Sequence, residues 1–299
     1  MSTTPPSIPA PDAPIGLLAA WGRFPITVAE ALREQGNPVV CLGLRGHADP
    51  ALAKIANRFE WTGATRLGRA IRFFRRHGAR HATMAGKLHK AQFYRPNALL
   101  YHLPDLAFVR AFWPHVFART ADQRDDTLLT TLVNAFASGG VEFLPPTDFA
   151  PELLVKAGSL TGRSLTPAQQ ADVEFGWEMA KQMGGLDIGQ SVCIKDRAVF
   201  AVEAIEGTDA AIRRAGGLCR AGGLTVVKVS KPNQDMRFDV PTVGVGTLHA
   251  MVEAGAKVLA IEADKTILLD EEAFRETAEK FGLSVVVLPS AAAAARLAA

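Results

Sequence analysis

The sequence predicts an α/β protein of two domains, and three observations carry this prediction. Short apolar runs alternate with longer stretches of helical spacing, which is the pattern of sheets whose strands are joined by helices. The 299 residues amount to about two average domains. Glycines at 139–140 and prolines between 145 and 151 interrupt the pattern near the middle of the chain. We therefore expect an N-terminal α/β domain at 15–150 and a C-terminal catalytic α/β domain at 160–289.

In the first domain, strand and helix patterns follow one another in strict alternation. The apolar run that ends before Gly22 leads into a helical pattern after Pro25, and a third short run ends at Gly86. Such an order indicates an open, Rossmann-like parallel sheet. The predicted elements are strands at 15–20, 38–44 and 81–85 and helices at 26–35, 67–77 and 128–138.

The second domain begins with a helix start signal. Thr166 and Pro167 have the residue types of an N-cap and a first helical position, which predicts a helix at 168–183. Two β-rich runs on either side of Asp196 and Arg197 predict a hairpin. The other predicted elements are strands at 191–195, 198–204, 224–229, 258–261, 267–269 and 284–288 and helices at 209–215, 247–254 and 271–281.

Composition and charge exclude several classes of protein. Hydrophobic residues make up 48% and charged residues 21%, so the chain has the composition of an ordinary globular protein. The net charge of +3 comes from scattered basic residues and gives no case for a nucleic-acid partner. No apolar run is long enough to span a membrane. The Pro-rich stretch 1–14 is typical of a disordered leader, and 290–299 forms an Ala-rich tail.

The three cysteines lie far apart in apolar or small-residue surroundings. No CxxC pair occurs, so the sequence predicts neither a zinc ribbon nor a disulfide scaffold. A reducing cytoplasm fits this usage best, and Cys193 and Cys219 are expected to be buried.

The turn after the first strand is one candidate binding site. A strand that enters a helix through a small-residue turn, as at Gly22, can present backbone N–H groups to a phosphate, and Lys87 follows a similar turn at Gly86. The alternative is structural, because every open α/β sheet needs such turns. A GxGxxG fingerprint is absent here, so a nucleotide-dependent oxidoreductase is a poor fit.

A denser group of polar residues follows two predicted strands of the second domain. The first strand leads into Glu203 and Thr208, and the second, at 224–229, carries Lys228 and leads into a charged loop between two prolines. The polar residues of this second strand and its loop are Lys228, Lys231, Gln234, Asp235, Arg237 and Asp239.

This combination of acids and bases is what a metal-assisted phosphate site requires. Carboxylates bind a hard cation such as Mg²⁺, while Lys and Arg neutralise phosphate oxygens. Asp235, Arg237 and Asp239 alternate, so in an extended segment they would point to one side. The alternative is a solvated loop whose charges pair with one another. For the basic helix around 69–76, a solvated face and a contact with an anionic membrane both stay open.

Several blocks of the chain resemble the LpxI-type UDP-2,3-diacylglucosamine pyrophosphatases. The blocks are GLLAAWGRFPITVAEAL (16–32), MAGK (84–87), DDTLL (125–129), AVEAIEGTDAAIRRAG (201–216) and VKVSKPNQDMRFDVPTVG (227–244). The resemblance implies a two-domain cytoplasmic enzyme of lipid A biosynthesis that depends on Mg²⁺. Its substrate would be a lipid-linked sugar nucleotide, and its products would be UMP and 2,3-diacylglucosamine 1-phosphate (lipid X).

The resemblance also implies roles for individual residues. One essential catalytic aspartate is expected, which we match to Asp235 with Asp239 as the alternative. Asp235, with Asp239 or Glu203, would bind Mg²⁺. The expected substrate-binding residues are Lys228, Lys231, Gln234, Arg237, Thr208, Gly22 and Lys87.

A rival hypothesis is a regulatory protein that binds the sugar nucleotide without turning it over. Such a binder gains nothing from aspartates beside a phosphate, since they repel it unless a metal intervenes. The sequence leaves open whether the protein forms a homodimer and whether it contacts the inner membrane as a peripheral protein.

Overall fold

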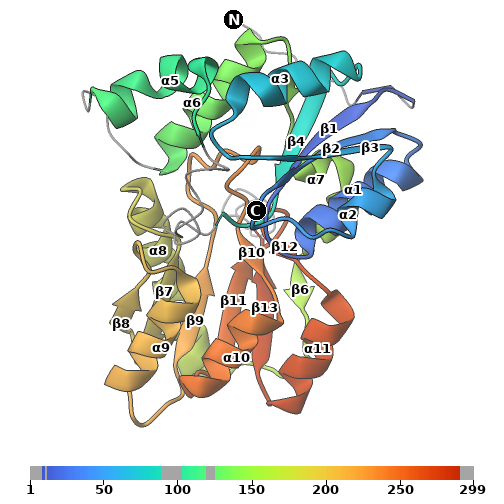
Figure 1. The fold of residues 1–299 in the computed structure, drawn as a ribbon. Coiled ribbons are helices and arrows are strands. Elements are labelled where there is room, and N and C mark those ends of the chain that lie inside the picture. The colour runs from blue at the N-terminus through green and yellow to red at the C-terminus, as the bar shows by residue number, and fades with distance from the viewer. Residues whose placement is uncertain (1–8, 11, 89–102, 119–124, 290–299) are drawn as a thin grey trace, which may run out of the picture. The chain divides into compact units, whose positions relative to one another are not determined.

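The protein is described by a computed structural model that covers residues 9–10, 12–88, 103–118 and 125–289 (Figure 1). The predicted tail, most of the predicted leader and the segments 89–102 and 119–124 lie outside these residues. The chain forms two compact units. Unit 1 comprises Met1–Pro151 with Met236–Asp239, and unit 2 comprises Glu152–Asp235 with Val240–Ala299.

Unit 1 contains a five-stranded sheet in the order β3-β2-β1-β4-β5, and all of its strand pairs are parallel. The predicted open parallel sheet is therefore confirmed. The strands are β1 (Ile15–Ala19), β2 (Val39–Leu44), β3 (Arg58–Thr62), β4 (His81–Ala85) and β5 (Glu142–Phe143). Sequence reasoning missed β3, whose residues are mostly polar because it is an edge strand with exposed side chains.

Helices cover both faces of this sheet, as the alternation of buried side chains along β2 requires. Val39 and Cys41 pack with one helix group, and Val40 and Leu42 pack with the other. The first group is α1 (Phe24–Glu34), α2 (Leu52–Ile55) and α7 (Pro146–Phe149). The second group is α3 (Leu67–Arg76), α5 (Leu106–Phe112) and α6 (Asp125–Ser138).

Unit 2 contains a six-stranded mixed sheet in the order β6-β13-β11-β9-β7-β8. β9, β11 and β13 are parallel to one another, while β7 is antiparallel to both β9 and β8. The strands are β6 (Gly158–Ser159), β7 (Ser191–Lys195), β8 (Ala198–Val202), β9 (Thr225–Lys228), β11 (Val258–Glu262) and β13 (Ser284–Leu288). A separate small sheet pairs β10 (Thr242–Val243) with β12 (Ile267–Leu268).

Both faces of the larger sheet are buried. Val227 faces a cluster with α8 (Pro167–Gly185), and Val226 faces α9 (Thr208–Leu218), α10 (Val245–Glu253) and α11 (Glu271–Lys280). Thr166 is the N-cap of α8, as the Thr-Pro signal predicted, and it forms a capping box with Gln169. None of the helices in the described part of the chain has the length and apolar character of a bilayer-spanning helix.

The predicted hairpin is confirmed and has a two-residue turn. Asp196 and Arg197 both have positive φ, 52° and 58°, which matches the twist of the flanking strands β7 and β8. The buried carboxylate of Asp172 on α8 accepts hydrogen bonds from both of their backbone N–H groups. The hairpin is thus held on the helix that covers this face of the sheet.

The prediction that Asp235, Arg237 and Asp239 point to one side is wrong, because the segment is not extended. It turns at 232–233 and again at 236–238. A hydrogen bond from the Gln234 N–H to the Lys231 carbonyl, 3.1 Å, closes the first turn. Phe238 packs against the apolar cluster of α3, α5 and α6, which fixes the second turn within unit 1.

All three cysteines are buried, as expected for Cys193 and Cys219. Burial raises the pKa of the Cys41 and Cys193 thiols from 9.0 to about 12. Since the folded state holds these protons more tightly than the unfolded state, the stability they contribute is complete below about pH 9 and falls as the pH rises toward 12.

We expect iodoacetamide at about pH 8 to leave Cys41 and Cys193 unmodified in the native protein, because alkylation requires the thiolate. Mass spectrometry of peptides with and without denaturant measures the modification. Urea titrations at pH 8 and 10 should give a lower midpoint at the higher pH. Rapid labelling of either thiol in the native protein would contradict the burial.

Candidate functional site

The polar residues of unit 2 gather at one edge of its larger sheet. β9 and β11 are parallel, and β8 runs in the same direction because both β8 and β9 are antiparallel to β7. The carboxyl ends of these strands therefore meet at one edge. Glu203 follows β8, Lys228 ends β9 and Glu262 ends β11. Three charged side chains that are far apart in sequence thus share this edge.

Glu203, Thr208 and Lys228, which the sequence analysis assigned to one candidate site, form a connected network there. The Thr208 hydroxyl donates to Glu203 Oε1 (2.9 Å) and accepts from Lys228 Nζ (3.0 Å). Lys228 Nζ also donates to the Thr242 carbonyl at the start of β10 (3.0 Å). Ser191 Oγ, at the beginning of β7, lies 3.4 Å from the Thr208 hydroxyl. Thr208 thus joins the Lys228 ammonium and the Glu203 carboxylate in one hydrogen-bonded network.

Burial makes this network chemically unusual. Glu203 is 9% exposed and Lys228 is 6% exposed. Among the described residues, no hydrogen-bond donor reaches the buried Glu203 Oε2. An acceptor oxygen that is buried without a donor has a free-energy cost, which a bound cation or a ligand donor would remove. Glu206 does not share this environment, since it is drawn to Arg214, whose hydrogen bond lowers the Glu206 pKa.

The loop after β9 is held in place up to the residue before Asp235. Lys231 N–H donates to Gln234 Oε1 (2.7 Å), and Lys231 Nζ forms an ion pair with Asp187 just after α8 (2.8 Å). A Cβ on Gly184 would lie 3.3 Å from the Lys231 Cα, so the end of α8 packs closely against the loop. Asp235 follows directly and is partly buried.

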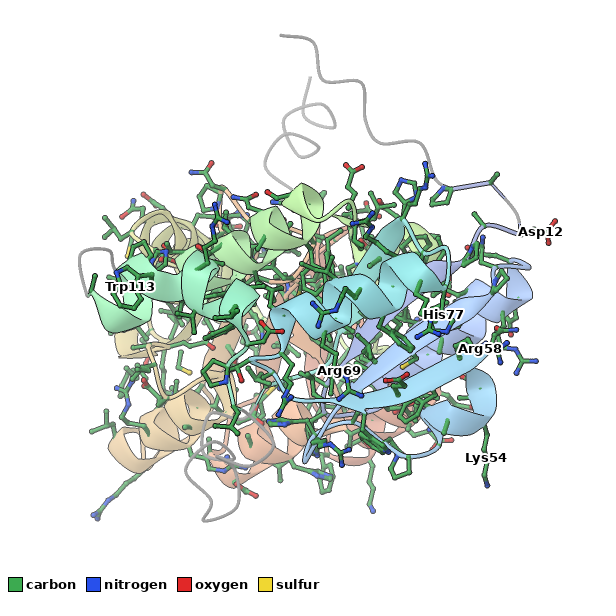
Figure 2. All side chains as sticks on the ribbon, turned by 45° about the horizontal axis from the view of Figure 1, so that its top comes forward. Asp12, Lys54, Arg58, Arg69, His77 and Trp113 are labelled. Atoms are coloured by element: carbon green, nitrogen blue, oxygen red, sulfur yellow. The ribbon has the colours of Figure 1, made fainter. Side chains whose placement is uncertain are left out.

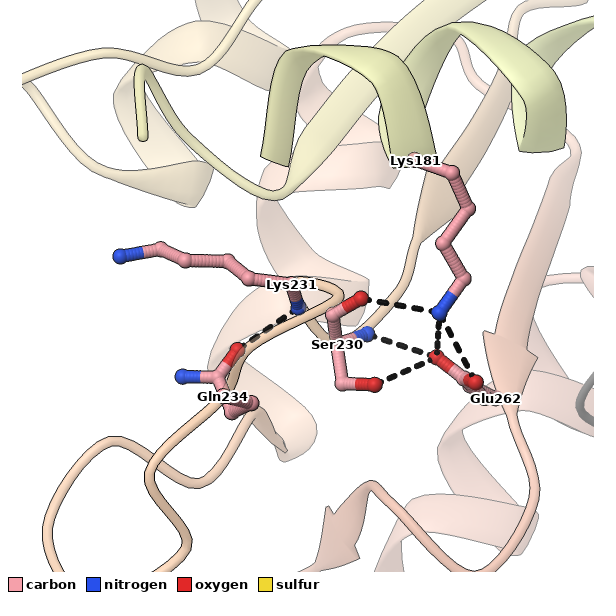
Figure 3. A network of polar contacts seen from close by, with 5 residues as sticks. All are labelled: Lys181, Ser230, Lys231, Gln234 and Glu262. Atoms are coloured by element: carbon pink, nitrogen blue, oxygen red, sulfur yellow. Dashed lines mark hydrogen bonds and ion pairs between the residues drawn. The ribbon is translucent and has the colours of Figure 1, made fainter. Parts of the chain in front are cut away.

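A second network at this edge was missed by sequence reasoning (Figure 3). Glu262 Oε2 accepts hydrogen bonds from Ser230 N–H and Ser230 Oγ, both 2.8 Å, and from Lys181 Nζ (2.7 Å). Lys181 is on α8, so three elements meet at one carboxylate. The available signal was Glu262 itself, a single charge at the end of the apolar run VLAIE.

In unit 1, the predicted turn lies at the switch point of the sheet. The strand order reverses at β1, between β2 and β4, and ligands of open α/β sheets bind outside the carboxyl ends of such strands. Trp21 and Lys87 exchange backbone hydrogen bonds of 3.1 and 2.9 Å, which places Gly22 beside Lys87. Gly86 is required there, because a Cβ would lie 2.8 Å from the Trp21 carbonyl oxygen.

A cavity of about 520 Å³ opens beside this turn. The helix α1 that follows has no side-chain cap and no acidic residue in its first turn, so its N-terminus favours an anion. The lining residues are Trp21, Gly22, Arg23, Ile26, His47, Asp49 and Pro50.

The remaining predicted residues are placed differently from the sequence interpretation. Arg237 and Asp239 belong to the segment that groups with unit 1, whereas Asp235 and Glu203 belong to unit 2. Within the described ranges, no three His, Cys, Asp or Glu side chains come together with the spacing of a metal site. Asp235, Asp239 and Glu203 therefore do not form a three-carboxylate cluster in this structure.

The fold and these sites define a two-domain α/β protein with polar sites at the carboxyl ends of strands in both units. Models of two families match the chain: the LpxI N-terminal domain over residues 14–153 and the LpxI C-terminal domain over residues 156–286. The protein belongs to the LpxI family. A relative from Caulobacter vibrioides, named UDP-2,3-diacylglucosamine pyrophosphatase LpxI, is 30% identical over 279 residues, which are 91% of this chain and 96% of the relative.

Gly189, just before β7, controls the position of Glu203. A Cβ there would lie 2.2 Å from the Glu203 carbonyl oxygen, so we expect Gly189→Ala to lower the free energy of unfolding by about 1–3 kcal/mol. Urea denaturation measures the loss. Gly217→Ala is the matched control, because its Cβ meets open space in α9. Equal midpoints for the two variants would show that β7 and Glu203 are not tightly packed.

Proposed function

We propose that this protein hydrolyses the pyrophosphate bond of UDP-2,3-diacylglucosamine, producing UMP and 2,3-diacylglucosamine 1-phosphate in lipid A biosynthesis. The observation that carries the proposal is the buried network of Glu203, Thr208 and Lys228 beside the held loop that leads into Asp235. Membership of the LpxI family and the name of the Caulobacter relative support the same substrate.

The cations of this edge suit the charge of a pyrophosphate. Lys228 donates hydrogen bonds to Thr208 and to the Thr242 carbonyl, so its ammonium is held in place, and a held cation stabilises developing charge effectively. We assign Lys228, Lys231 and Arg237 to phosphate oxygens. Thr208 and Gln234 are assigned to hydrogen bonds with the sugar or the phosphates.

The oxygen donors of the site fit Mg²⁺. Mg²⁺ is commonly held by one or two carboxylates together with substrate phosphates and water, so three clustered carboxylates are not required. The buried, donor-free Glu203 Oε2 has the chemistry of such a ligand, and we assign Asp235, with Asp239 or Glu203, to the cation. When bound, Mg²⁺ would neutralise pyrophosphate charge and lower the pKa of a coordinated water.

The hydrolysis itself exchanges one P–O bond for another. A water oxygen bonds to one phosphorus and releases its protons to solvent, the bridging P–O bond breaks, and the departing phosphate oxygen keeps the electron pair. Attack at either phosphorus gives the same two products. We assign Asp235 to orienting this water through its carboxylate, and the lysines to stabilising the departing phosphate.

Unit 1 offers a further contact for the substrate. The turn at Gly22 and Lys87 beside the uncapped start of α1 favours an anionic group, and we assign it to the sugar nucleotide.

We expect UMP release from UDP-2,3-diacylglucosamine to require Mg²⁺, to stop with EDTA, and to fall at least about 1,000-fold in Asp235→Asn. Asp239→Asn tests the alternative assignment. Asp264→Asn is the matched control, because Asp264 is an exposed aspartate of unit 2 whose positive φ asparagine tolerates. Chromatographic detection of UMP measures the turnover of the wild type and of the three variants.

The outcomes separate the hypotheses. Near-normal turnover in both Asp235→Asn and Asp239→Asn would contradict the assignment of an essential aspartate to this loop. Tight binding of the lipid substrate by the wild type without UMP release, with any divalent metal, would favour the non-catalytic sugar-nucleotide-binding protein.

We also propose a peripheral contact between unit 1 and an anionic membrane, where a diacylated substrate resides. The segment 51–88 contains nine basic residues and one acid, Glu60. Its basic side chains include an exposed row on α3, of which Figure 2 labels Arg69. Because the apolar side of α3 is buried in unit 1, the contact would be electrostatic rather than inserted.

We expect the Arg72→Gln/Arg75→Gln/Arg76→Gln variant to bind vesicles of phosphatidylethanolamine and phosphatidylglycerol at least about tenfold more weakly, since each basic residue contributes about 1 kcal/mol. Sedimentation with the vesicles measures binding, and phosphatidylcholine vesicles provide the uncharged surface. A control variant with Arg220, Lys257 and Lys265 changed to Gln removes the same charge from unit 2. Equal loss of vesicle binding in both variants would contradict a membrane contact that is specific to the α3 face of unit 1.

A further inference from the structure

Ser230 is the first residue of the loop after β9 that leaves the sheet, and all of its polar atoms are bound. Its N–H and hydroxyl donate to Glu262 Oε2 (both 2.8 Å), and its carbonyl accepts from Lys181 Nζ (2.9 Å). Ser230 is 3% exposed and Glu262 is 2% exposed. The backbone at this point is therefore fixed by two side chains from elements distant in sequence.

We propose that Lys181 and Glu262 form a positioning pair, which holds Ser230 and thereby sets the place of Asp235 in the reaction. The role rests on the function proposed above. Neither residue is assigned a contact with the substrate; each acts through the loop backbone.

All the hydrogen bonds described for Lys181 are made to Glu262 and Ser230. Lys181 Nζ donates to both oxygens of Glu262 (2.9 and 2.7 Å) and to the Ser230 carbonyl, and it lies 5.5 Å from the ring centroid of Trp177. The two carboxylate oxygens and the carbonyl account for the three N–H groups of an ammonium, and the ring face adds a cation–π contact. Its position on α8 thus defines the position of the loop relative to the helix.

From Ser230, the restraint extends along the chain toward Asp235. The next residue, Lys231, is tied through its N–H to Gln234 and through its ammonium to Asp187. Gln234 N–H returns to the Lys231 carbonyl (3.1 Å) and closes the turn. The chain from Ser230 to Gln234 is therefore joined through one closed turn to a point that Lys181 and Glu262 define.

An ion pair between a partly buried lysine and a buried carboxylate is a poor device for stability alone. Desolvation offsets most of the attraction, and apolar residues of similar size often stabilise a fold equally well or better. What apolar residues lack is direction: they would not fix the N–H, hydroxyl and carbonyl of one serine at once. The presence of an ion pair at this place therefore points to a positional role.

The experiment compares Ser230→Ala and Glu262→Gln with wild type. Hydrogen exchange of peptides covering 229–235, in the free protein, should be at least about tenfold faster in Glu262→Gln, because the Ser230 N–H loses its charged acceptor. In both Ser230→Ala and Glu262→Gln, the kcat for UMP release should fall about 10- to 100-fold, as expected when a reacting group is displaced by about 1 Å. The KM should change less than about threefold. Ser284→Ala is the matched control, since Ser284 is a buried serine at the start of β13, on the opposite edge of the sheet.

A double variant separates positioning from folding. Lys181→Met/Glu262→Leu removes both charges together, so no buried charge is left unpaired. The Ser230 N–H, hydroxyl and carbonyl still lose their partners, so the melting temperature should fall, but by less than in Glu262→Leu alone. Its kcat should nevertheless fall as in Glu262→Gln. Lys195→Met controls for loss of a partly buried lysine, because Lys195 binds a backbone carbonyl, that of Gly222, at the other edge.

Unchanged exchange of the loop in Glu262→Gln would overturn the proposal, and so would faster exchange with an unchanged kcat. Full activity in the double variant would overturn it as well. Should the wild-type protein release no UMP with Mg²⁺, the proposed function fails, and the exchange comparison still decides whether the pair holds the loop.

Discussion

The buried carboxylate of Glu262 is the constraint on which the polar edge of unit 2 depends. A carboxylate that is 2% exposed must find donors within the protein, since its desolvation would otherwise outweigh what β11 gains by packing there. Lys181 and Ser230 supply these donors, so a strand, a helix and a loop are joined at one point. The loop that carries Asp235 leaves the sheet from this point, and its course follows from that junction.

Glu203 occupies a comparable place after β8 at the same edge of the sheet, and the contrast between the two glutamates is informative. Glu262 has donors on both carboxylate oxygens. In the described structure, Glu203 has a donor on Oε1 only, and Oε2 is buried without one. A fully satisfied carboxylate is suited to holding structure, whereas an unsatisfied one beside Lys228 and Thr208 is suited to receiving a ligand. The same sheet edge thus carries one glutamate that is suited to holding structure and one that is suited to binding a ligand.

The sequence predicted most elements because their signals are local. Strand runs, the Thr166 cap and the Asp196–Arg197 turn each depend on neighbouring residues, and all were confirmed. The edge strand β3 was missed although RFEWT alternates polar and apolar residues, because the strand is short and has only two apolar residues. The alternation of Asp235 and Arg237 gave a wrong prediction of side-chain direction, because that prediction required an extended chain. The Lys181–Glu262 pair joins residues 81 apart in sequence, and no periodicity links them.

These differences follow from how a binding edge is built. Parallel strands bring their carboxyl ends together whatever their order in the chain, so charged residues that end apolar strands are assembled by topology rather than by a motif. A sequence therefore reveals which residues are charged and which strands are buried, but the partner of each charge depends on the strand order. In unit 2 that order places β11 directly beside β9, which is why Glu262 reaches Ser230. The start of the loop is fixed because β11 lies beside β9. The position of Asp235, and any chemistry it carries out, therefore depends on this strand order.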